Sequence, residues 1–382
     1  MDGGRFLGAF RACSGITDAV VLNHVPVGCN WGAGMFNSIS QQADIRHACT
    51  VVHEREIVFG GEEALKRALE LADKTCSTPL LVVISGDVPS IIGDDVQSVI
   101  DSLSLRKDVL WLEAAGYKGS MRDGYEDALV KLESLMKECE IKRRSVNLIG
   151  LCPDDFKVHA DLNEIRRNIE ALDISVNSTI SMCSLEEFCT APAAELNLVM
   201  GQGVDLAKKM KDDFGTPYIE LDYPYGLEGS SKFLEALSGR LGVEYCEEKF
   251  IDLEPFKRTY LHQHEIYGTG VSVTGDFRCH SMSDFLEREL GFEIEVKCSY
   301  DQCSSFEDDV RRSNTMMLFG SSFERGLARE LAIPLMRFVY PVFDQVCMYD
   351  YAPYAGLRGT VFLTESIINT LMGFDKRPRY SA

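Results

Sequence analysis

Short apolar runs alternate with amphipathic segments along almost the whole chain, and this rhythm limits the possible folds more than any other feature. Residues 80–84 (LLVVI) and 196–200 (LNLVM) are typical of strands buried on both faces. Residues 62–74 and 204–214 carry apolar side chains at helical spacing. Strand, loop and helix repeated in this order predict parallel sheets covered by helices on both faces. The predicted fold class is therefore α/β.

The rhythm restarts twice, which predicts three doubly wound domains. A second series of strands begins near residue 145 with VNLIGL, and a third begins with GVSVTG at 270–275. We place the domains at residues 1–144, 145–263 and 264–382, since a chain of 382 residues exceeds what one hydrophobic core usually serves. In each domain, ligand sites are expected at the carboxyl ends of the strands.

Composition narrows the classes of partner. The chain has 39 Lys and Arg against 59 Asp and Glu, a net charge of −20, which argues against nucleic acid or an anionic membrane as a partner. No apolar stretch approaches the length of a membrane span, and the N-terminal residues MDGGRFLGAF show no charged-then-apolar signal region, so a cytoplasmic location is expected. Thirteen cysteines without regular spacing favour free thiols, a few of them metal ligands.

Nucleotide-binding motifs are missing from the expected places. GTGVSVTG, at 268–275, puts its glycines before and after the strand, unlike a dinucleotide fingerprint. GLEGSSK, at 226–232, has no lysine directly after its second glycine and is not a P-loop. We expect the chain to bind neither NAD nor ATP itself.

Residues 20–34, VVLNHVPVGCNWGAG, combine a short apolar strand with a predicted glycine-rich loop. Glycine lets a backbone approach a bulky group closely, and Pro26 stiffens the segment. Cys29 on such a loop is well placed to hold an inorganic group. It could equally be a buried thiol in a tight turn, and this segment alone does not decide between the two.

Three segments together resemble a known family. HVPVGC (24–29), HEREIVFGGEEAL (53–65) and SGDVPSIIGDDV (85–96) occur in the order and at the spacing found in the catalytic component of nitrogenase and its relatives. IPLMRFVYPVFD (333–344) resembles a later segment of that family, and LNLVMGQGVDLAKKM (196–210) its middle domain. The resemblance covers almost the whole chain, and it is closer to the β-type subunit than to the cofactor-bearing type.

This resemblance implies three Rossmann-like domains and an iron–sulfur cluster, of the four-iron four-sulfur or P-cluster-like kind, between two component-1 subunits. It also implies a separate ATP-dependent iron–sulfur reductase as electron donor, and a second component-1 subunit, identical or different. The implied activity is an oxidoreductase acting on a substrate other than, or not only, dinitrogen. The alternative is a non-catalytic partner subunit or a cofactor-assembly scaffold of the same family.

The cluster ligands transfer only in part. Cys29 falls on the family's second cluster cysteine, whereas the first would fall near Gly4, which has no thiol. Cys13 is the nearest replacement, although it could be a core thiol. The third position falls on Asp87, which could ligate iron or merely cap a turn. Cys49 is a fourth candidate.

The large-cofactor site also looks altered. The cysteine that anchors that cofactor in the family would fall near Gly201, and the histidine would fall on Ala355. We therefore expect no iron–molybdenum-type cofactor from this chain. If the cavity binds an organic substrate instead, Tyr351, Tyr354 and Arg358 are candidate lining residues, although tyrosines in such places more often pack in the core.

Two charged groups have simple interpretations. Residues 53–56, His-Glu-Arg-Glu, either orient a loop near the cluster and meet the reductase or form a solvated helix start, and we prefer the second interpretation. Asp94 and Asp95 are expected to cap a helix that begins there.

Overall fold

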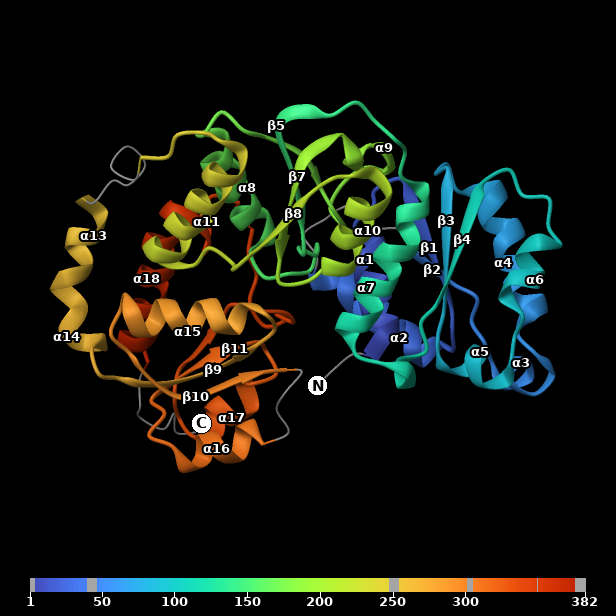
Figure 1. Cartoon of the computed structure of the whole chain (residues 1–382). Helices are drawn as coiled ribbons and strands as arrows, with labels where there is room; N and C mark the ends of the chain where they lie inside the picture. Colours follow the sequence, from blue (N-terminus) through green and yellow to red (C-terminus); the bar gives the residue numbers. More distant parts are fainter. Residues whose placement is uncertain (1–3, 40–46, 247–253, 301–304, 349, 375–382) are drawn as a thin grey trace. The chain divides into compact units, whose positions relative to one another are not determined.

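The computed structural model contains three four-stranded sheets that share one strand order (Figure 1). It describes residues 4–39, 47–246, 254–300, 305–348 and 350–374. In each sheet the second strand in sequence lies at one edge, followed by the first, third and fourth: β2-β1-β3-β4, β6-β5-β7-β8 and β10-β9-β11-β12. The strands are β1 (Ala19–His24), β2 (His47–Cys49), β3 (Leu80–Ser85), β4 (Asp108–Glu113), β5 (Lys142–Ile149), β6 (Ser175–Thr179), β7 (Ala194–Met200), β8 (Tyr218–Leu221), β9 (Gly270–Gly275), β10 (Glu293–Ser299), β11 (Met317–Gly320) and β12 (Leu335–Arg337).

Every pairing in the first and third sheets is parallel, and β5 pairs in parallel with β7. In each sheet, the second strand lies on one side of the first strand, and the chain then continues on the other side with the third and fourth strands. In doubly wound folds, ligands bind outside the carboxyl ends of the strands at this reversal. The α/β fold class with parallel sheets is thus confirmed, and it directs attention to the ends of β1 and β3.

The chain divides into two compact units, the first made of residues 1–154 and 176–220, the second of residues 155–175 and 221–382. The predicted boundaries near residues 144 and 263 follow the three sheets rather than these units, so they remain a prediction. Helices of the first unit are α1 (Gly4–Ser14), α2 (Val27–Ile39), α3 (Glu54–Phe59), α4 (Glu62–Thr75), α5 (Asp87–Ile92), α6 (Val96–Asp101), α7 (Met121–Leu132), α9 (Leu185–Cys189) and α10 (Val204–Phe214). Those of the second are α8 (Val158–Glu170), α11 (Gly226–Leu241), α13 (Glu254–Thr259), α14 (Gln263–Ile266), α15 (Arg278–Arg288), α16 (Phe306–Arg312), α17 (Arg325–Glu330) and α18 (Gly356–Met372).

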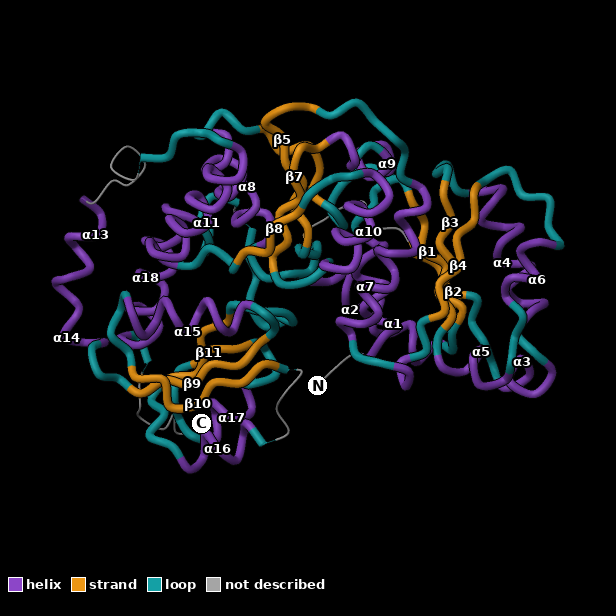
Figure 2. The backbone as a smooth tube through the Cα atoms, in the orientation of Figure 1, coloured by secondary structure: helices purple, strands orange, loops and turns teal. Residues whose placement is uncertain are grey.

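In the first unit, the first sheet is covered by helices on both faces (Figure 2). α4 and α6 cover one face, where Leu65 and Leu69 pack on Val83. α1 and α7 cover the other face, and their apolar residues join the cores of the first and second sheets into one cluster. This burial explains why residues 80–84 are apolar without alternation, since both faces of β3 are covered.

α1 and α7 pack so closely that only glycine fits at the contact. A Cβ atom on Gly8 would lie 1.8 Å from the carbonyl oxygen of Met121, and one on Gly124 would lie 2.0 Å from that of Arg5. Neither approach leaves room for a side chain. The sequence pattern predicts a helix over residues 124–139 but does not predict α1, whose apolar face is short and interrupted by glycine.

Several predicted elements agree with the structure. Residues 204–214 form α10 and residues 270–275 form β9. In the second unit, Arg337 pairs with Asp344 through two hydrogen bonds of 2.9 and 2.6 Å, which accounts for these two positions in the segment IPLMRFVYPVFD. The described residues include eleven free cysteines, as expected, whereas Cys298 is disulfide-bonded, which departs from that expectation.

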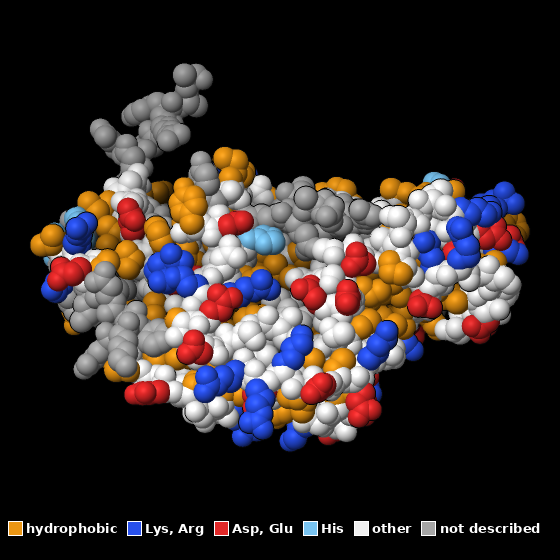
Figure 3. All heavy atoms as spheres, turned by 90° about the horizontal axis from the view of Figure 1, so that it is seen from above, with side chains coloured by type: hydrophobic (Ala, Val, Ile, Leu, Met, Phe, Trp, Pro, Cys, Tyr) orange, Lys and Arg blue, Asp and Glu red, His pale blue; other side chains and the backbone are white. Residues whose placement is uncertain are grey.

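The surface mixes charges of both signs. On the face seen in Figure 3, Lys and Arg side chains are interspersed with Asp, Glu and apolar groups. Within the part of the chain that the structure describes, no helix is both long and apolar enough to cross a membrane.

The carboxylate of Glu126, on α7, closes the N-terminus of α10. It accepts hydrogen bonds from the backbone N–H groups of Gly203 (2.7 Å), Val204 (3.3 Å) and Asp205 (3.1 Å). These are among the first N–H groups of a helix, which have no partner inside the helix. Because Glu126 is buried, no water replaces it easily.

Replacing Glu126 by alanine should leave these N–H groups unsatisfied. We expect Glu126→Ala to lower the free energy of opening of α10 by about 1–3 kcal/mol. Native-state hydrogen exchange of the α10 amides measures this. Exposed Glu138 is the matched control, and an equal effect of Glu138→Ala would contradict the assignment.

Candidate cluster-binding site

Three candidate donor residues lie at or just after the carboxyl ends of three neighbouring strands. Cys29 follows β1, Cys49 is the last residue of β2, and Asp87 follows β3. Since β2, β1 and β3 are adjacent and parallel, all three residues lie at the same edge of the first sheet. This edge includes the point where the strand order reverses, the usual ligand position of such a sheet.

Cys29 lies on a helix rather than on the predicted loop. Residues 27–39 form α2, and the carbonyl oxygen of Pro26 accepts hydrogen bonds from the N–H groups of Cys29 (3.1 Å) and Asn30 (3.2 Å). The prediction of a loop is wrong because Pro26 starts a helix and the glycines within it are tolerated. The Cys29 thiol is exposed in the first turn.

The ionisation of the two thiols depends on their neighbours at this edge. Partial burial, together with the negative charge of Asp87, raises the pKa of Cys29. Burial also raises the pKa of Cys49, and the nearby Cys29 adds to the effect, whereas hydrogen bonds to the backbone of Val51 and Val25 oppose it. Two thiols and a carboxylate thus form one electrostatic group, and a metal ion would stabilise their deprotonated forms.

Position 4 also reaches this edge, although it carries no thiol. A Cβ atom on Gly4 would lie 3.0 Å from the Cα atom of Gly116, and one on Gly116 would lie 3.4 Å from a carboxylate oxygen of Asp87. The Tyr117 N–H donates a 3.4 Å hydrogen bond to the same carboxylate. The correspondence of position 4 to a ligand of the family is therefore spatially consistent, but the ligand itself is absent.

Cys13 lies elsewhere. Its side chain is fully buried in the apolar cluster between the first and second sheets, together with Phe10 and Leu129. Burial raises the pKa of this thiol strongly. The core environment agrees with the alternative interpretation of Cys13 as a packing residue, and we do not include it among the proposed ligands.

A buried histidine–aspartate pair ties the three motif segments together. His24 Nε2 lies 3.0 Å from Asp94 Oδ2, and both side chains are almost completely buried. The other oxygen of Asp94 accepts a 2.8 Å hydrogen bond from the Gly61 N–H. His24 belongs to HVPVGC, Gly61 to the Phe-Gly-Gly turn and Asp94 to the Ile-Gly-Asp-Asp loop.

Only glycine fits at position 61. A Cβ atom there would lie 2.5 Å from Asp94 Oδ2 and 2.9 Å from the His24 ring. The expectation that both aspartates cap a helix is thus half correct. Asp95 caps α6 by accepting from Ser98 N–H at 3.0 Å, whereas Asp94 pairs with His24 and Gly61. The three motifs are evident in the sequence and the contact between them is not, although their joint occurrence could have suggested it.

Large apolar side chains are exposed around this edge. Phe59 at the end of α3 is 83% exposed and Trp31 on α2 is 68% exposed, and Val27, Val58, Ile91 and Tyr117 are exposed as well. The helix α3 has no buried residue, and this exposure agrees both with a solvated helix start at residues 53–56 and with a surface that meets a partner. Exposed apolar residues in such number are typical of an interaction surface.

The candidate pocket residues of the second unit have different environments. Tyr354 is buried beside Phe156, and burial raises the pKa of its hydroxyl. Arg358 donates a 2.6 Å hydrogen bond from Nε to Glu164, and Tyr351 is largely exposed. The role of Tyr351, Tyr354 and Arg358 in lining a pocket stays a prediction.

Ala355, at the position of the family's histidine ligand, is fully buried. Asp161 accepts hydrogen bonds from the N–H groups of Tyr354 (2.6 Å) and Ala355 (3.0 Å) and from the Tyr223 hydroxyl (2.7 Å). Burial raises the pKa of Asp161, although these hydrogen bonds oppose it. A carboxylate thus holds the start of α18 in place.

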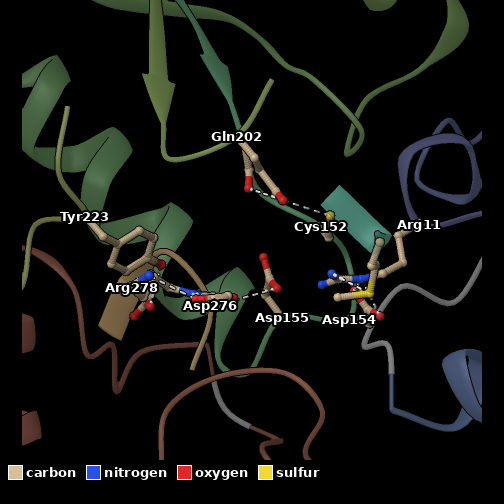
Figure 4. A network of polar contacts seen from close by, with 11 residues as sticks. Arg11, Cys152, Asp154, Asp155, Gln202, Tyr223, Asp276 and Arg278 are labelled. Carbon is tan, nitrogen blue, oxygen red and sulfur yellow. Dashed lines mark hydrogen bonds and ion pairs between the residues drawn. The ribbon is translucent and has the colours of Figure 1, made fainter. Parts of the chain in front are cut away.

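Polar networks lie beside the ends of β5, β7 and β9 (Figure 4). In the second unit, Arg278 is buried, pairs with Asp155 at 2.8 Å and with Asp276, and lies over the Tyr223 ring. In the first unit, Arg11 pairs with Asp154 at 2.9 Å.

Beside Gly201 in the first unit, the neighbouring Gln202 donates a 3.0 Å hydrogen bond to the carbonyl oxygen of Gly150. Gly201 itself has no side chain that could bind a metal. Among the described residues, no group of three or more His, Cys, Asp and Glu side chains is arranged to hold a metal ion alone.

Comparison with known proteins identifies the family. The family model described as nitrogenase component 1 type oxidoreductase matches residues 5–311 and 295–372. The chain belongs to this family. The B subunit of light-independent protochlorophyllide reductase from Zygnema circumcarinatum is 23% identical over 422 residues, which cover 96% of this chain and 82% of that protein.

Two further comparisons agree with this family. The nitrogenase iron-molybdenum cofactor biosynthesis protein NifE of Methanosarcina barkeri is 29% identical over 265 residues, which cover 64% of this chain and 56% of that protein. A solved structure described as nitrogenase Cp1 at pH 6.5 superposes with a TM-score of 0.84 and 20% identity, over 97% of this chain and 92% of that chain. The superposition with this solved structure shows a common fold.

The predicted resemblance to nitrogenase component 1 is thereby confirmed. The family is one of oxidoreductases whose members bind iron–sulfur clusters and work with an ATP-dependent reductase component and other subunits. The predicted α/β architecture of the nitrogenase component-1 type is confirmed by the same superposition.

The buried ring of His24 predicts a pH dependence of stability. Burial lowers the pKa of His24 below its ordinary value of 6.5, although Asp94 opposes this. As the pH falls below that value, the unfolded chain binds a proton that the folded chain does not, so the folded state loses stability. His24→Gln has no such titration, so the advantage of the wild type, about 1–3 kcal/mol at neutral pH, should shrink on acidification.

Thermal unfolding midpoints of both proteins between about pH 8 and pH 5.5 measure this difference. Titrating groups away from this pair are the same in both proteins and cancel. A difference that grows as the pH falls would show that His24 is protonated and paired with Asp94 in the folded state.

Proposed function

We propose that this chain is a nitrogenase-like component-1 subunit that accepts electrons from an ATP-dependent iron–sulfur reductase. In this proposal the electrons pass through an iron–sulfur cluster, of the four-iron four-sulfur or P-cluster-like kind, shared with a second component-1 subunit. The substrate is one other than, or not only, dinitrogen. The observation that carries the proposal is the grouping of Cys29, Cys49 and Asp87 at one edge of the first sheet.

The donor set suits an iron–sulfur cluster that is shared between chains. Thiolate sulfur is the preferred ligand of such clusters, and a carboxylate also binds iron. Cys29 is exposed and would supply the first sulfur ligand, with Cys49 and Asp87 as neighbouring donors. Because no third thiol accompanies them among the described residues, the remaining ligands would come from the second subunit.

The bound cluster would supply one-electron transfer. The chain's own residues would hold it and exclude water from it: Cys29 presents its sulfur from the first turn of α2, and Asp87 presents a carboxylate from the first turn of α5. The Tyr117 N–H fixes the orientation of that carboxylate. The exposed side chains of Val27 and Trp31 would become buried against the second subunit.

The reductase would dock on α3. This helix is exposed along its whole length, carries Val58 and Phe59 at its end, and follows Cys49 closely in the chain. Apolar anchors of this kind dominate the binding energy of protein interfaces. Docking here would bring the electron donor to the same edge of the sheet as the cluster.

An organic substrate fits this chain better than dinitrogen does. The positions of the family's large-cofactor ligands are occupied by Gly201 and Ala355, which have no metal-binding group. The substrate would then be held by side chains, for which Tyr351, Tyr354 and Arg358 remain the candidates. The similarity to the B subunit of protochlorophyllide reductase supports an organic substrate.

The second candidate function is a non-catalytic partner subunit or a cofactor-assembly scaffold. The missing thiol at Gly4 and the similarity to a cofactor biosynthesis protein favour it. A scaffold would hold a cluster without supporting turnover. Reduction of substrate by the purified complex, with reductase and ATP present, distinguishes the two functions.

Removing the Cys29 sulfur should reduce cluster binding. We expect Cys29→Ala to lose more than half of the iron and acid-labile sulfide of the anaerobically purified wild type and to change its EPR signal. Cys76→Ala is the matched control, because Cys76 is a free, half-buried thiol between α4 and β3, at the opposite edge of the sheet. If the wild type contains no iron, or if Cys29→Ala retains all of it, the cluster proposal fails.

Changing α3 should affect the reductase and not the cluster. We expect Phe59→Ser to lower reductase-dependent reduction by about tenfold or more while the iron content stays unchanged, since this 83% exposed side chain would lose its apolar contact with the reductase. Leu71→Ser, on exposed Leu71 of α4, is the control. Equal effects of the two substitutions would place the docking surface elsewhere.

A further inference from the structure

A buried chain of hydrogen bonds links the turn that follows α3 to the segments that carry the donor residues. The Gly61 N–H donates to Asp94 Oδ1 (2.8 Å), and Asp94 Oδ2 lies 3.0 Å from His24 Nε2. His24 Nδ1 lies 2.9 Å from the Thr50 hydroxyl. The chain is therefore Gly61–Asp94–His24–Thr50, and we call it the clamp.

Each member of the clamp adjoins one functional segment. Gly61 comes two residues after the end of α3, and His24 ends β1 shortly before Cys29. Thr50 and Asp94 adjoin the segments of the other two donors. Thr50 directly follows Cys49, and Asp94 follows the short helix α5, which begins at Asp87. The clamp thus touches all three donor segments and the outer helix at once.

The clamp has little freedom to adapt. The side chains of His24 and Asp94 are 0% and 2% exposed, so water does not replace a broken hydrogen bond easily. With Asp94 accepting from Nε2–H and the Thr50 hydroxyl donating to Nδ1, every polar atom of the neutral His24 ring has a partner. The lack of space for a side chain at Gly61 keeps the backbone of the turn against the ring.

We propose that His24 and Asp94 are positioning residues that couple the position of α3 to that of Cys29, Cys49 and Asp87. A partner that moves α3 would displace the Gly61 N–H, and the clamp would pass this displacement to the three donor segments. The relevance to electron transfer rests on the proposed function, but the coupling is a property of the chain itself. The competing interpretation is that Asp94 only caps the N-terminus of α4.

Breaking the clamp should loosen α3, α5 and β2 together. In the full-length, metal-free protein, we expect Asp94→Ala to raise amide hydrogen exchange in α3 and α5 by about tenfold or more. It should also raise the alkylation rate of Cys49, whose sulfur is held by the carbonyl of Val25 (3.4 Å). Mass spectrometry after peptic digestion measures both quantities.

Asp95→Ala is the matched control for charge and position. Asp95 is the next residue in the chain, and its carboxylate caps α6 without contacting the clamp. Its removal should speed exchange in α6 and leave α3 and the Cys49 alkylation rate unchanged. Cys76, a half-buried thiol at the opposite edge, serves as the internal reference for alkylation.

A second variant opens the clamp without removing a polar group. In Gly61→Ala the added Cβ would collide with Asp94 and the His24 ring, so the same three segments should loosen. Gly239→Ala on α11, where a Cβ meets no atom within 4 Å, is its control. Asp94→Asn keeps the size of the side chain and one acceptor oxygen, so it should raise hydrogen exchange by an intermediate amount. Unchanged exchange of β9 and β11 shows that the second unit of the variant is folded.

The outcomes separate this inference from the proposed function. If Asp94→Ala and Gly61→Ala speed exchange only at the start of α4, and Cys49 reacts as in the wild type, the coupling is refuted and Asp94 is only a cap. If the coupling is observed but the wild type never binds iron, the clamp stands and the cluster proposal fails. If the wild type binds iron, the EPR line shape of iron-loaded Asp94→Asn should differ from that of the wild type.

Discussion

The buried pair of His24 and Asp94 is the contact on which the organisation of the first sheet's ligand edge depends. Parallel strands only bring segments to a common edge and do not fix how their loops are arranged. Here one imidazole and one carboxylate, both almost completely buried, link the ends of β1 and α5 to the turn that follows α3. The exposed residue Cys29 lies five positions after His24, in the segment that begins at this pair.

Carboxylates at helix N-termini are a second recurring device. Glu126 and Asp161 accept hydrogen bonds from backbone N–H groups at the starts of α10 and α18. Glu289 likewise accepts hydrogen bonds from Leu227 N–H (2.8 Å) and Glu228 N–H (3.0 Å) at the start of α11. In doubly wound folds such N-termini commonly bind the phosphates of nucleotides. Here the chain's own carboxylates satisfy the same N–H groups, which agrees with the lack of a nucleotide fingerprint in GTGVSVTG.

The chain keeps the component-1 fold, whereas Gly4, Gly201 and Ala355 stand where the resemblance implies metal ligands. At 20% identity the superposition extends over 97% of the chain, because a packed α/β core tolerates many apolar exchanges. Ligand positions are less tolerant, since glycine at position 4 and alanine at position 355 supply no donor atom. We interpret this chain as one that contributes part of a site and obtains the rest from a partner.

The sequence by itself determined the fold class, the family, most of the central strands and the candidates Cys29, Cys49 and Asp87. Apolar periodicity and motif order are local properties, and they survive without knowledge of contacts: β9 and α10 were predicted at the bounds that the structure has. Only the tertiary structure decided that Cys29 lies on a helix, that Cys13 is a core thiol and that Asp94 pairs with His24. The last of these outcomes depends on residues 70 positions apart meeting in the interior, and hydrogen bonds of that range leave no periodic signal in the chain.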